Sequence, residues 1–561
     1  MSDKKLKLVL CWHMHQPEYR DRQTGKFMLP WTYLHVIKDY VDMVAHLEAV
    51  PAAKAVVNFA PILLEQIEDY AAQINRFLSE RSLIKDPLLA ALAGQAVPSH
   101  AADRLKLLKN CMKANRERQV DRYPVFSRLV DMASWVESHQ DSVNYVNEQF
   151  ITDILVWYHL AWLGETVKKD DNRAQRLIEK ASGFSFDDRL ELLELINDLL
   201  KGVIGRYKTL AIQGRVELSV TPYAHPIMPL MLDIASAHEA MPDASLPELK
   251  SYPGGEERVL WHLQKGIDTF QQFFGFRPLG CWPSEGSVSA KTLDLLSEFG
   301  FKWTASGGSV LHNSLHASGI EAKGVHHPYK LADSDIACFF RDDGLSDLIG
   351  FEYSKWHADD AVADLIHHLE NTVRHEPAGS VVSIIMDGEN AWEYFPENGY
   401  HFLSALYRRL SDHPNIELAT FSECLGDHVT VKSLPKLVAG SWVYGTFSTW
   451  IGSPDKNRGW DMLGDVKESF DKAVLSGKLT EQAIAEAELQ LAVCEGSDWF
   501  WWFGDYNPGE AVSDFEKQYR LNLTNLYRLL DEEPPAYLEL SFTKGAGAPA
   551  MGGAMRRGKE I

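Results

Sequence analysis

The stretch Val381-Val382-Ser383-Ile384-Ile385-Met386-Asp387-Gly388-Glu389-Asn390-Ala391-Trp392 decides the fold. A mostly apolar run of this length predicts a strand that is buried on both faces, as in a parallel sheet. The run stops on an acid, and parallel α/β barrels carry their chemistry at the carboxyl ends of their strands. Asp387 is therefore a candidate catalytic group, although an acid in this position is also a common helix N-cap.

A second acid, Glu285, occurs in a comparable frame, Gly280-Cys281-Trp282-Pro283-Ser284-Glu285-Gly286. It follows a helix-like segment and the turn-forming residues 275–278. A glutamate in a turn is often only solvated. Two carboxylates on separate barrel strands nevertheless suggest the hydrolysis of a glycosidic bond.

Short β-rich runs recur along the chain, and helical periodicity follows several of them, as at 361–374 and 400–410. This alternation predicts a parallel sheet, and seven such strands could close it into a barrel. The runs are Leu6–Cys11, Ala55–Phe59, Val216–Val220, Phe301–Ala305, Ile336–Arg341, Val381–Met386 and Ile416–Thr420.

Two regions lack such strand signals. Residues 80–210 contain long amphipathic stretches and predict a helical insertion within a catalytic barrel that spans 1–430. Residues 431–541 predict a helical C-terminal region that contributes to the active-site cleft. The last residues, 542–561, are small, Gly-rich and basic, which is typical of a disordered tail.

Composition narrows the range of partners. Hydrophobic residues make up 45% and charged residues 24% of the 561 residues, as in an ordinary globular protein. The formal net charge of -22 argues against nucleic acid and anionic membranes as partners, because both would repel the chain. A neutral or cationic small molecule fits better, and no feature of the sequence points to an oligomeric state.

The sequence also indicates a compartment. The apolar run at the N-terminus is too short for a signal peptide, and no run reaches the ~18 residues of a membrane span. The six cysteines are scattered and form no Cys-x-x-Cys pair. A soluble protein of the reducing cytoplasm is therefore expected.

Three histidines stand near predicted strand ends. His13 and His15 alternate along the first strand, so they point to the same face. His225 follows the strand 216–220 in a loop that prolines stiffen. These side chains could bind a metal, hold substrate hydroxyls or satisfy buried polar groups.

Arg341 and the tryptophans complete the candidate residues. Arg341 and several acids follow an apolar strand, and an internal ion pair is expected for at least one of them. Many of the sixteen tryptophans lie in the C-terminal region. Turn residues and acids flank several of them, such as Trp442, Trp450 and Trp499, and this setting suggests rings that stack on a sugar.

With these residues assembled, the chain resembles glycoside hydrolase family 57, the α-amylase and glucanotransferase group. The resemblance covers most of residues 5–510, and four motifs occur in the order of the family. They are His15-Gln16-Pro17, Gly214-Arg215-Val216-Glu217 through His225-Pro226, Trp282-Pro283-Ser284-Glu285 and Asp387-Gly388-Glu389. Ser284 departs from the proline that many members carry before the nucleophile, and the details resemble a bacterial branch of amylases and mannosidases.

The resemblance implies a (β/α)7 barrel of the α/β class with a helical C-terminal region, and a retaining reaction without metal or cofactor. Glu285 would be the nucleophile and Asp387 the acid/base. The implied substrate is an α-glucan or malto-oligosaccharide, with water or a sugar as the acceptor. The expected substrate-binding residues are His13, His15, Gln16, Glu217, His225, Trp282, Arg341, Glu389, Trp392, Trp450, Asp455, Trp460 and Trp499.

Two alternatives stay open. One is a metal-dependent carbohydrate hydrolase on a similar barrel, a deacetylase or an α-mannosidase, with His13, His15 and Asp387 as ligands. No His-x-x-x-His pair lies near these residues. The other is a non-catalytic glucan-binding protein, which the presence of both carboxylates argues against.

Overall fold

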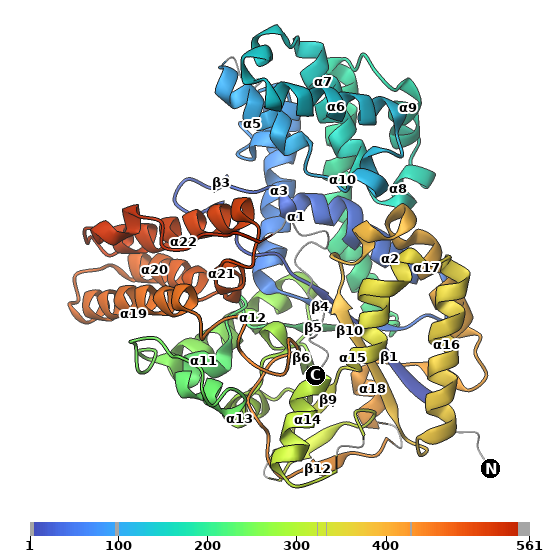
Figure 1. Cartoon of the computed structure of the whole chain (residues 1–561), viewed down its shortest axis with the longest axis vertical. Helices are drawn as coiled ribbons and strands as arrows, with labels where there is room; N and C mark the ends of the chain where they lie inside the picture. Colours follow the sequence, from blue (N-terminus) through green and yellow to red (C-terminus); the bar gives the residue numbers. More distant parts are fainter. Residues whose placement is uncertain (1–4, 96–99, 322–323, 333, 427–428, 548–561) are drawn as a thin grey trace.

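Seven parallel strands form the centre of the computed structural model, which describes residues 5–95, 100–321, 324–332, 334–426 and 429–547 (Figure 1). Each strand pairs in parallel with its neighbours in the sheet. Their order is β10 (Val381–Asp387), β1 (Leu6–Met14), β4 (Ala55–Phe59), β5 (Val216–Val220), β6 (Gly280–Cys281), β7 (Trp303–Ser306) and β9 (Ala337–Phe340).

Two hydrogen bonds bring the ends of this curled sheet together. The N–H of Asp342 donates to the oxygen of Ser383 at 2.8 Å, and Arg341 Nε donates to the oxygen of Ile385 at 2.8 Å. The segment after β9 thus lies against β10. The predicted fold class, α/β with a (β/α)7 barrel, is confirmed.

One strand of the expected seven is different. The run at 416–420 forms β11 (Ile416–Leu418), which pairs with β1 outside the main strand order, and β6 takes its place in the barrel. β6 has only two residues, too few for a periodic pattern. A Cβ at Gly280 would meet the Trp303 ring at 1.8 Å, so glycine is required there and makes the strand look like a turn.

The interior of the barrel is apolar at the end away from the carboxyl ends of the strands. Its core consists of small, β-branched and aromatic residues that include Val9, Cys11, Val56, Trp303, Ala305, Phe339 and Ile385. Helix α18 (Phe421–Gly426) closes this end, because Phe421 packs on Trp303 and Phe339. The polar residues of the interior lie toward the carboxyl ends of the strands, where the register sets His13 beside Asn58 and Asp387.

Helices follow most strands and cover the barrel. These are α1 (Trp31–His35), α2 (Val41–Ala49), α3 (Pro61–Glu80), α11 (Met228–Leu232), α12 (Gly255–Phe274), α13 (Ala290–Glu298), α14 (Gly308–Ala317), α15 (Asp343–Asp347), α16 (Ala358–His375) and α17 (Tyr400–Ser411). Two short strands, β8 (Tyr329–Leu331) and β12 (Lys432–Leu434), extend the sheet beyond β9.

The chain between β4 and β5 is helical. After α3 it forms α4 (Pro87–Leu92), α5 (Ala101–Cys111), α6 (Pro124–Ser138), α7 (Glu148–Ala161), α8 (Glu165–Asp170), α9 (Asn172–Lys180) and α10 (Phe186–Ile212). Figure 1 shows α5, α6, α7 and α9 as a block above the barrel, joined to it by α3 and α10. A capping box between Ser185 and Asp188 starts α10.

A second helical group follows the barrel and lies at its side in Figure 1. It contains α19 (Pro454–Leu475), α20 (Glu481–Cys494), α21 (Ser497–Trp502) and α22 (Gly509–Leu529). The domain boundaries at 430 and 541 stay a prediction. Within the described residues, no helix is both long and apolar enough to span a bilayer.

Residues 542–547, the first part of the predicted disordered tail, make contacts in the structure. Thr543 is buried and donates to Asp455 at 2.7 Å, and the N–H of Gly547 donates to the oxygen of Asn507 at 3.0 Å. Residues 542–547 therefore pack on the C-terminal helices. Residues 548–561 of the predicted tail lie outside the described residues.

Candidate active site

Glu285 sits in a turn directly after β6, at the carboxyl end of the barrel. Its backbone is left-handed, with φ 57° and ψ 26°. Such a conformation costs a non-glycine residue about 1–3 kcal/mol and persists only where the surroundings enforce it. The oxygen of Glu285 accepts a hydrogen bond from the N–H of Trp442 at 3.0 Å, which holds the turn from the C-terminal side.

The carboxyl group of Glu285 is held by one oxygen. Trp442 Nε1 donates to Oε2 at 2.8 Å, and no residue in the described part of the chain donates to Oε1. Burial and the negative charge of Asp387 raise the pKa of Glu285 well above its usual range, while the hydrogen bond from Trp442 opposes this shift. One oxygen is thus fixed and the other is free to react.

Asp387 ends β10 beside His13. The N–H of Gly388 donates to the oxygen of His13 at 2.7 Å, and Asn390 Nδ2 donates to Asp387 Oδ2 at 2.9 Å. Burial raises the pKa of Asp387, against the hydrogen bond from Asn390 and the positive charges nearby. The negative charge of Asp387 in turn raises the pKa of Glu285, so the two carboxyl groups interact electrostatically.

Three imidazole rings lie beside the carboxyl groups. His13 Nδ1 bonds to Asn58 Oδ1 at 2.7 Å, and His13 Nε2 lies 3.2 Å from His225 Nε2. Burial lowers the pKa of His13 to about 3 and that of His225 well below its usual range. Both rings are therefore neutral near pH 7, and one proton between their Nε2 atoms makes the contact a hydrogen bond.

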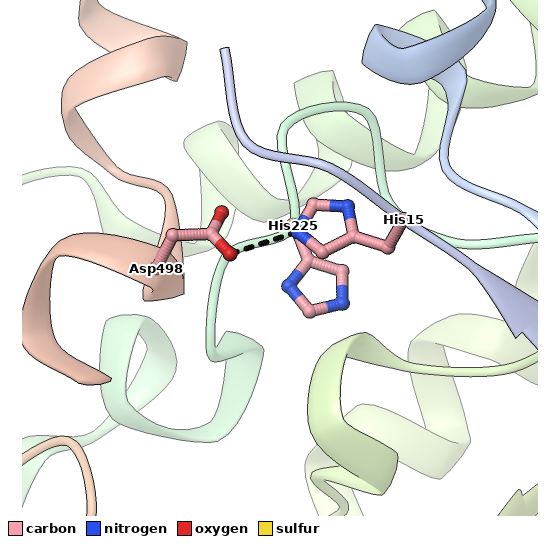
Figure 2. A group of neighbouring side chains, drawn as sticks. All are labelled: His15, His225 and Asp498. Carbon is pink, nitrogen blue, oxygen red and sulfur yellow. Dashed lines mark hydrogen bonds and ion pairs between the residues drawn. The ribbon is translucent and has the colours of Figure 1, made fainter. Parts of the chain in front are cut away.

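Two residues of α21 orient these histidines. His225 Nδ1 bonds to Ser497 Oγ at 2.8 Å, and His15 Nε2 bonds to Asp498 Oδ1 at 2.9 Å. Figure 2 shows His15 and His225 stacked, with Asp498 reaching them from the C-terminal region. The two rings have centroids 3.7 Å apart and planes 14° apart.

His15, His225 and Asp498 are also the one group among the described residues that could bring ligand atoms to a metal, within 4.8 Å of one another. Zinc lies about 2.0–2.1 Å from an imidazole nitrogen and in the plane of the ring. Because the two rings are stacked, their lone pairs run side by side and do not meet at such a point. The arrangement suits hydrogen bonding to hydroxyl groups better than it suits zinc.

Glu389 lies behind Asp387 and is only 2% exposed. Gln16 Nε2 donates to Glu389 Oε1 at 3.0 Å, and Tyr19 donates to Gln16 Oε1 at 3.0 Å. Burial and the charge of Asp387 raise the pKa of Glu389 well above its usual range. Its Oε2 is buried and has no partner within the described residues. Glu389 is therefore a buried neighbour of Asp387 whose surroundings disfavour its ionised form.

Arg341 forms the internal ion pair that the sequence predicts. Its guanidinium lies 3.0 Å from Asp343 and 2.7 Å from Asp347, and its Nε binds the end of β10. It also lies 5.7 Å from the centre of the Trp442 ring. These contacts make Arg341 a support of the barrel mouth, and its expected contact with substrate stays a prediction.

Several other expected substrate-binding residues lie elsewhere. The rings of Trp392, Trp450, Trp460 and Trp499 are at most 1% exposed and fill the core, because large apolar rings are buried wherever packing allows. Trp282 is fully buried, but it packs on Trp442 beneath the site.

Two acids are corrected as well. Glu217 lies one interior layer below His13, where it accepts hydrogen bonds from Trp303 and Ser422. Asp455 accepts a hydrogen bond from Thr543 and ties the C-terminal segment to α19. These contacts give both acids a structural role.

Sequence reasoning missed Asn58, Ser497 and Asp498 as site residues, and it counted Trp442 only among many tryptophans. Ser497 and Asp498 stand beside Trp499 in a motif that sequence analysis singled out for its ring. Their signal is the polar pair at the start of a short helix, but only the fold shows that they face His225 and His15.

Known structures share this architecture. One is the GH57-type branching enzyme of the hyperthermophilic archaeon Pyrococcus horikoshii, which is 16% identical in sequence. The match covers 96% of this chain and 92% of the branching enzyme, with a TM-score of 0.56. The alpha-amylase AmyC of Thermotoga maritima is 12% identical. The match covers 94% of this chain and 93% of the amylase, with a TM-score of 0.56. The 4-alpha-glucanotransferase of Thermococcus litoralis is 14% identical. The match covers 94% of this chain and 60% of the glucanotransferase, with a TM-score of 0.52.

At these identities the structural likeness shows the fold alone. No curated protein sequence matches the chain significantly. The sequence model described as Glycosyl hydrolase family 57, however, matches residues 9–436, which is most of the chain. On this match and on the barrel that carries Glu285 and Asp387, the chain belongs to glycosyl hydrolase family 57.

Proposed function

We propose that this protein is a retaining enzyme that cleaves α-glycosidic bonds in α-glucans, with Glu285 as nucleophile and Asp387 as acid/base. One observation carries the proposal. Two interacting carboxyl groups lie at the same end of the barrel, and among the described residues each has a single side-chain donor, which binds one of its two oxygens. Solved structures of the same fold are named as a branching enzyme, an amylase and a glucanotransferase, which supports an α-glucan as substrate.

In the first step, Oε1 of Glu285 attacks the anomeric carbon and the bond to the glycosidic oxygen breaks. Burial raises the pKa of both carboxyl groups, and the charge of Asp387 raises the pKa of Glu285 further. The positive charge that develops on the sugar stabilises ionised Glu285. We therefore assign the proton to Asp387, which gives it to the leaving oxygen.

In the second step, Asp387 takes a proton from the incoming acceptor, whose oxygen attacks the anomeric carbon and releases Glu285. Water as acceptor gives hydrolysis. A sugar hydroxyl gives transglycosylation or branching.

An imidazole ring can donate or accept hydrogen bonds, which suits a substrate rich in hydroxyl groups. His13, His15 and His225 lie at the carboxyl ends of β1 and β5, and we infer that they hold sugar hydroxyls together with Gln16 and Glu389. Asp498 and Ser497 orient His15 and His225, so the C-terminal helical region contributes to the cleft.

The proposal predicts that the two carboxyl groups lie about 5–5.5 Å apart, against roughly 6.5–9.5 Å in an inverting enzyme. The test is incubation with amylose, malto-oligosaccharides and α-mannosides, followed by resolution of the products. Shorter glucans indicate hydrolysis, and longer or branched ones indicate transfer. Turnover of none of the glucans by a folded protein would contradict the substrate class.

A metal-dependent hydrolase is the second candidate. The expected ligands are His13, His15 and Asp387, whereas the structure brings the ligand atoms of His15, His225 and Asp498 within 4.8 Å of one another, on stacked rings that do not point to one metal position. The two functions differ in their response to chelation. Activity that survives exhaustive treatment with a chelator supports the two-carboxylate mechanism, while activity that is lost and returns with added zinc supports the metal.

We also infer a cytoplasmic location. The six cysteines are all free and buried, which is typical of a reducing compartment. Cell fractionation with an antibody against the protein tests this, and recovery in a secreted fraction would contradict it.

A further inference from the structure

We propose that Trp442 is a positioning residue for the nucleophile: its indole N–H holds Glu285 Oε2 and thereby makes Oε1 the attacking atom. This inference rests on the proposed role of Glu285 and adds an atomic assignment to it. It also gives the segment after the barrel a direct part in the reaction.

Two hydrogen bonds join Trp442 and Glu285. Trp442 Nε1 donates to Oε2 at 2.8 Å, and the backbone N–H of Trp442 donates to the backbone oxygen of Glu285 at 3.0 Å. Two further backbone hydrogen bonds join Val288 and Gly440, at 2.9 Å and 3.1 Å. Residues 440–442 therefore run beside residues 285–288, and this pairing delivers the indole to the carboxyl group.

The surroundings leave the ring little freedom. The Trp442 ring meets the edge of Trp282 with centroids 5.2 Å apart, and the Arg341 guanidinium lies 5.7 Å from its centre. A Cβ at Gly307 would come within 2.6 Å of the Trp442 Cα, so glycine permits this close approach of the backbone. The position of the N–H is thus enforced from several sides.

The geometry divides the work between the two oxygens of Glu285. Oε1 forms the bond to the anomeric carbon, the glycosidic bond breaks, and its electron pair leaves with the departing oxygen, which takes a proton from Asp387. Oε2 then becomes the carbonyl oxygen of the ester. A hydrogen bond to a carboxylate is stronger than one to a neutral ester oxygen. The indole N–H therefore favours ionised Glu285 before attack and again when the second step releases it.

The test is the pH profile of kcat/KM on amylose for Trp442→Phe. Loss of a hydrogen bond to a charged group is expected to lower kcat/KM about 10- to 100-fold. Because this hydrogen bond holds down the pKa of Glu285, the acid limb of the profile should also move to higher pH. A merely structural role would lower activity without moving that limb.

The control is Trp450→Phe. Trp450 is a fully buried ring of the same region whose Nε1 has no partner within the described residues, so its profile should keep the wild-type acid limb. Should Trp442→Phe fail to fold, incorporation of benzothienylalanine at position 442 keeps the ring shape and removes only the donor.

An unchanged acid limb in the folded Trp442 variants, or an equal shift in Trp450→Phe, would overturn the inference. The proposed function fails separately, if Glu285→Gln keeps full turnover. The two failures are therefore distinguishable.

Discussion

Glu389 at the mouth of the barrel and Glu495 between α12 and the end of α20 are buried alike, at 2% and 1% exposure, yet their pKa values move in opposite directions. Burial raises both. Glu495 receives hydrogen bonds from Arg258, His262 and Tyr252 at 2.6–3.1 Å, and the charge of Arg258 leads the shift of its pKa down to about 2.

The difference lies in what surrounds each acid. At the barrel mouth, Glu389 meets Gln16 and the charge of Asp387, and Glu285 meets a single indole N–H. A buried acid with cations and donors on every side is a structural anchor. A buried acid beside other acids and few donors has a raised pKa instead, and groups with such shifts mark reactive sites.

The two regions are connected. The N–H of Ala224 approaches His262 Nδ1 at 3.4 Å, and the N–H of Ser497 donates to the oxygen of His225 at 2.9 Å. Glu495 thus fixes the start of α21, from which Ser497 and Asp498 reach the histidines. The ion pair anchors the segment that completes the site.

The largest expected effect separates the two regions by activity. Asp387→Asn should lower kcat about 10²- to 10⁴-fold, as loss of a general acid does, and Glu285→Gln should lower it at least as far. Neither change should lower the free energy of unfolding, because each removes a carboxyl group that burial disfavours in its charged form. Steady-state kinetics and urea unfolding measure the two quantities. A loss of folding in both variants would erase the distinction.

The next effect is on stability. Glu495→Gln leaves the Arg258 charge buried without its partner and should cost about 3–5 kcal/mol of unfolding free energy. Urea unfolding gives the value, and Glu389→Gln is the matched control, which should cost nothing near neutral pH. Equal losses in the two variants would show that burial alone, and not the surrounding donors and charges, decides what each acid contributes to stability.

The pH dependence of stability should have opposite signs in the same two variants. The lowered pKa of Glu495 stabilises the fold above pH 4.5, the usual value, and this contribution is lost as the pH falls toward about 2. The raised pKa of Glu389 works the other way, because ionisation costs stability as the pH rises above 4.5.

Thermal unfolding between pH 3 and pH 8 checks both signs. The loss of stability in Glu495→Gln should become smaller toward acid pH. The stability of Glu389→Gln relative to the wild type should increase toward alkaline pH. Parallel curves for the wild type and both variants would contradict these assignments.

The smallest effect on activity concerns the buried tryptophans. Trp460→Phe should leave KM for amylose unchanged and lower the free energy of unfolding by about 0.5–3 kcal/mol, because this ring fills the core. Kinetics on amylose and urea unfolding provide the check. A large rise in KM at unchanged stability would restore Trp460 as a substrate ligand.

The sequence was sufficient for most of the barrel. Buried parallel strands leave long apolar runs, as at 381–386, and the acid or histidine at a strand end stands out against them. Alternation along β1 also predicts that His13 and His15 share a face, and their rings are stacked with centroids 5.6 Å apart. Strand β6 was not predicted, because a strand of two residues is too short to show an alternating pattern.

The C-terminal contributions could not be predicted in the same way. Tryptophans with turn residues and acids around them occur in binding loops and at helix starts alike, and Trp499 at the start of α21 is buried. The useful residues, Trp442, Ser497 and Asp498, gain their roles only from tertiary contacts across more than 150 positions of sequence. No local pattern encodes such a contact.

The stereochemistry of the first-formed product tests the central claim most directly. Proton NMR can follow the anomeric signals during cleavage of a malto-oligosaccharide, before mutarotation mixes the two anomers. Attack by Glu285 followed by a second displacement predicts the α-anomer as the first product. The β-anomer as first product would show a single displacement and contradict the role of Glu285 as nucleophile.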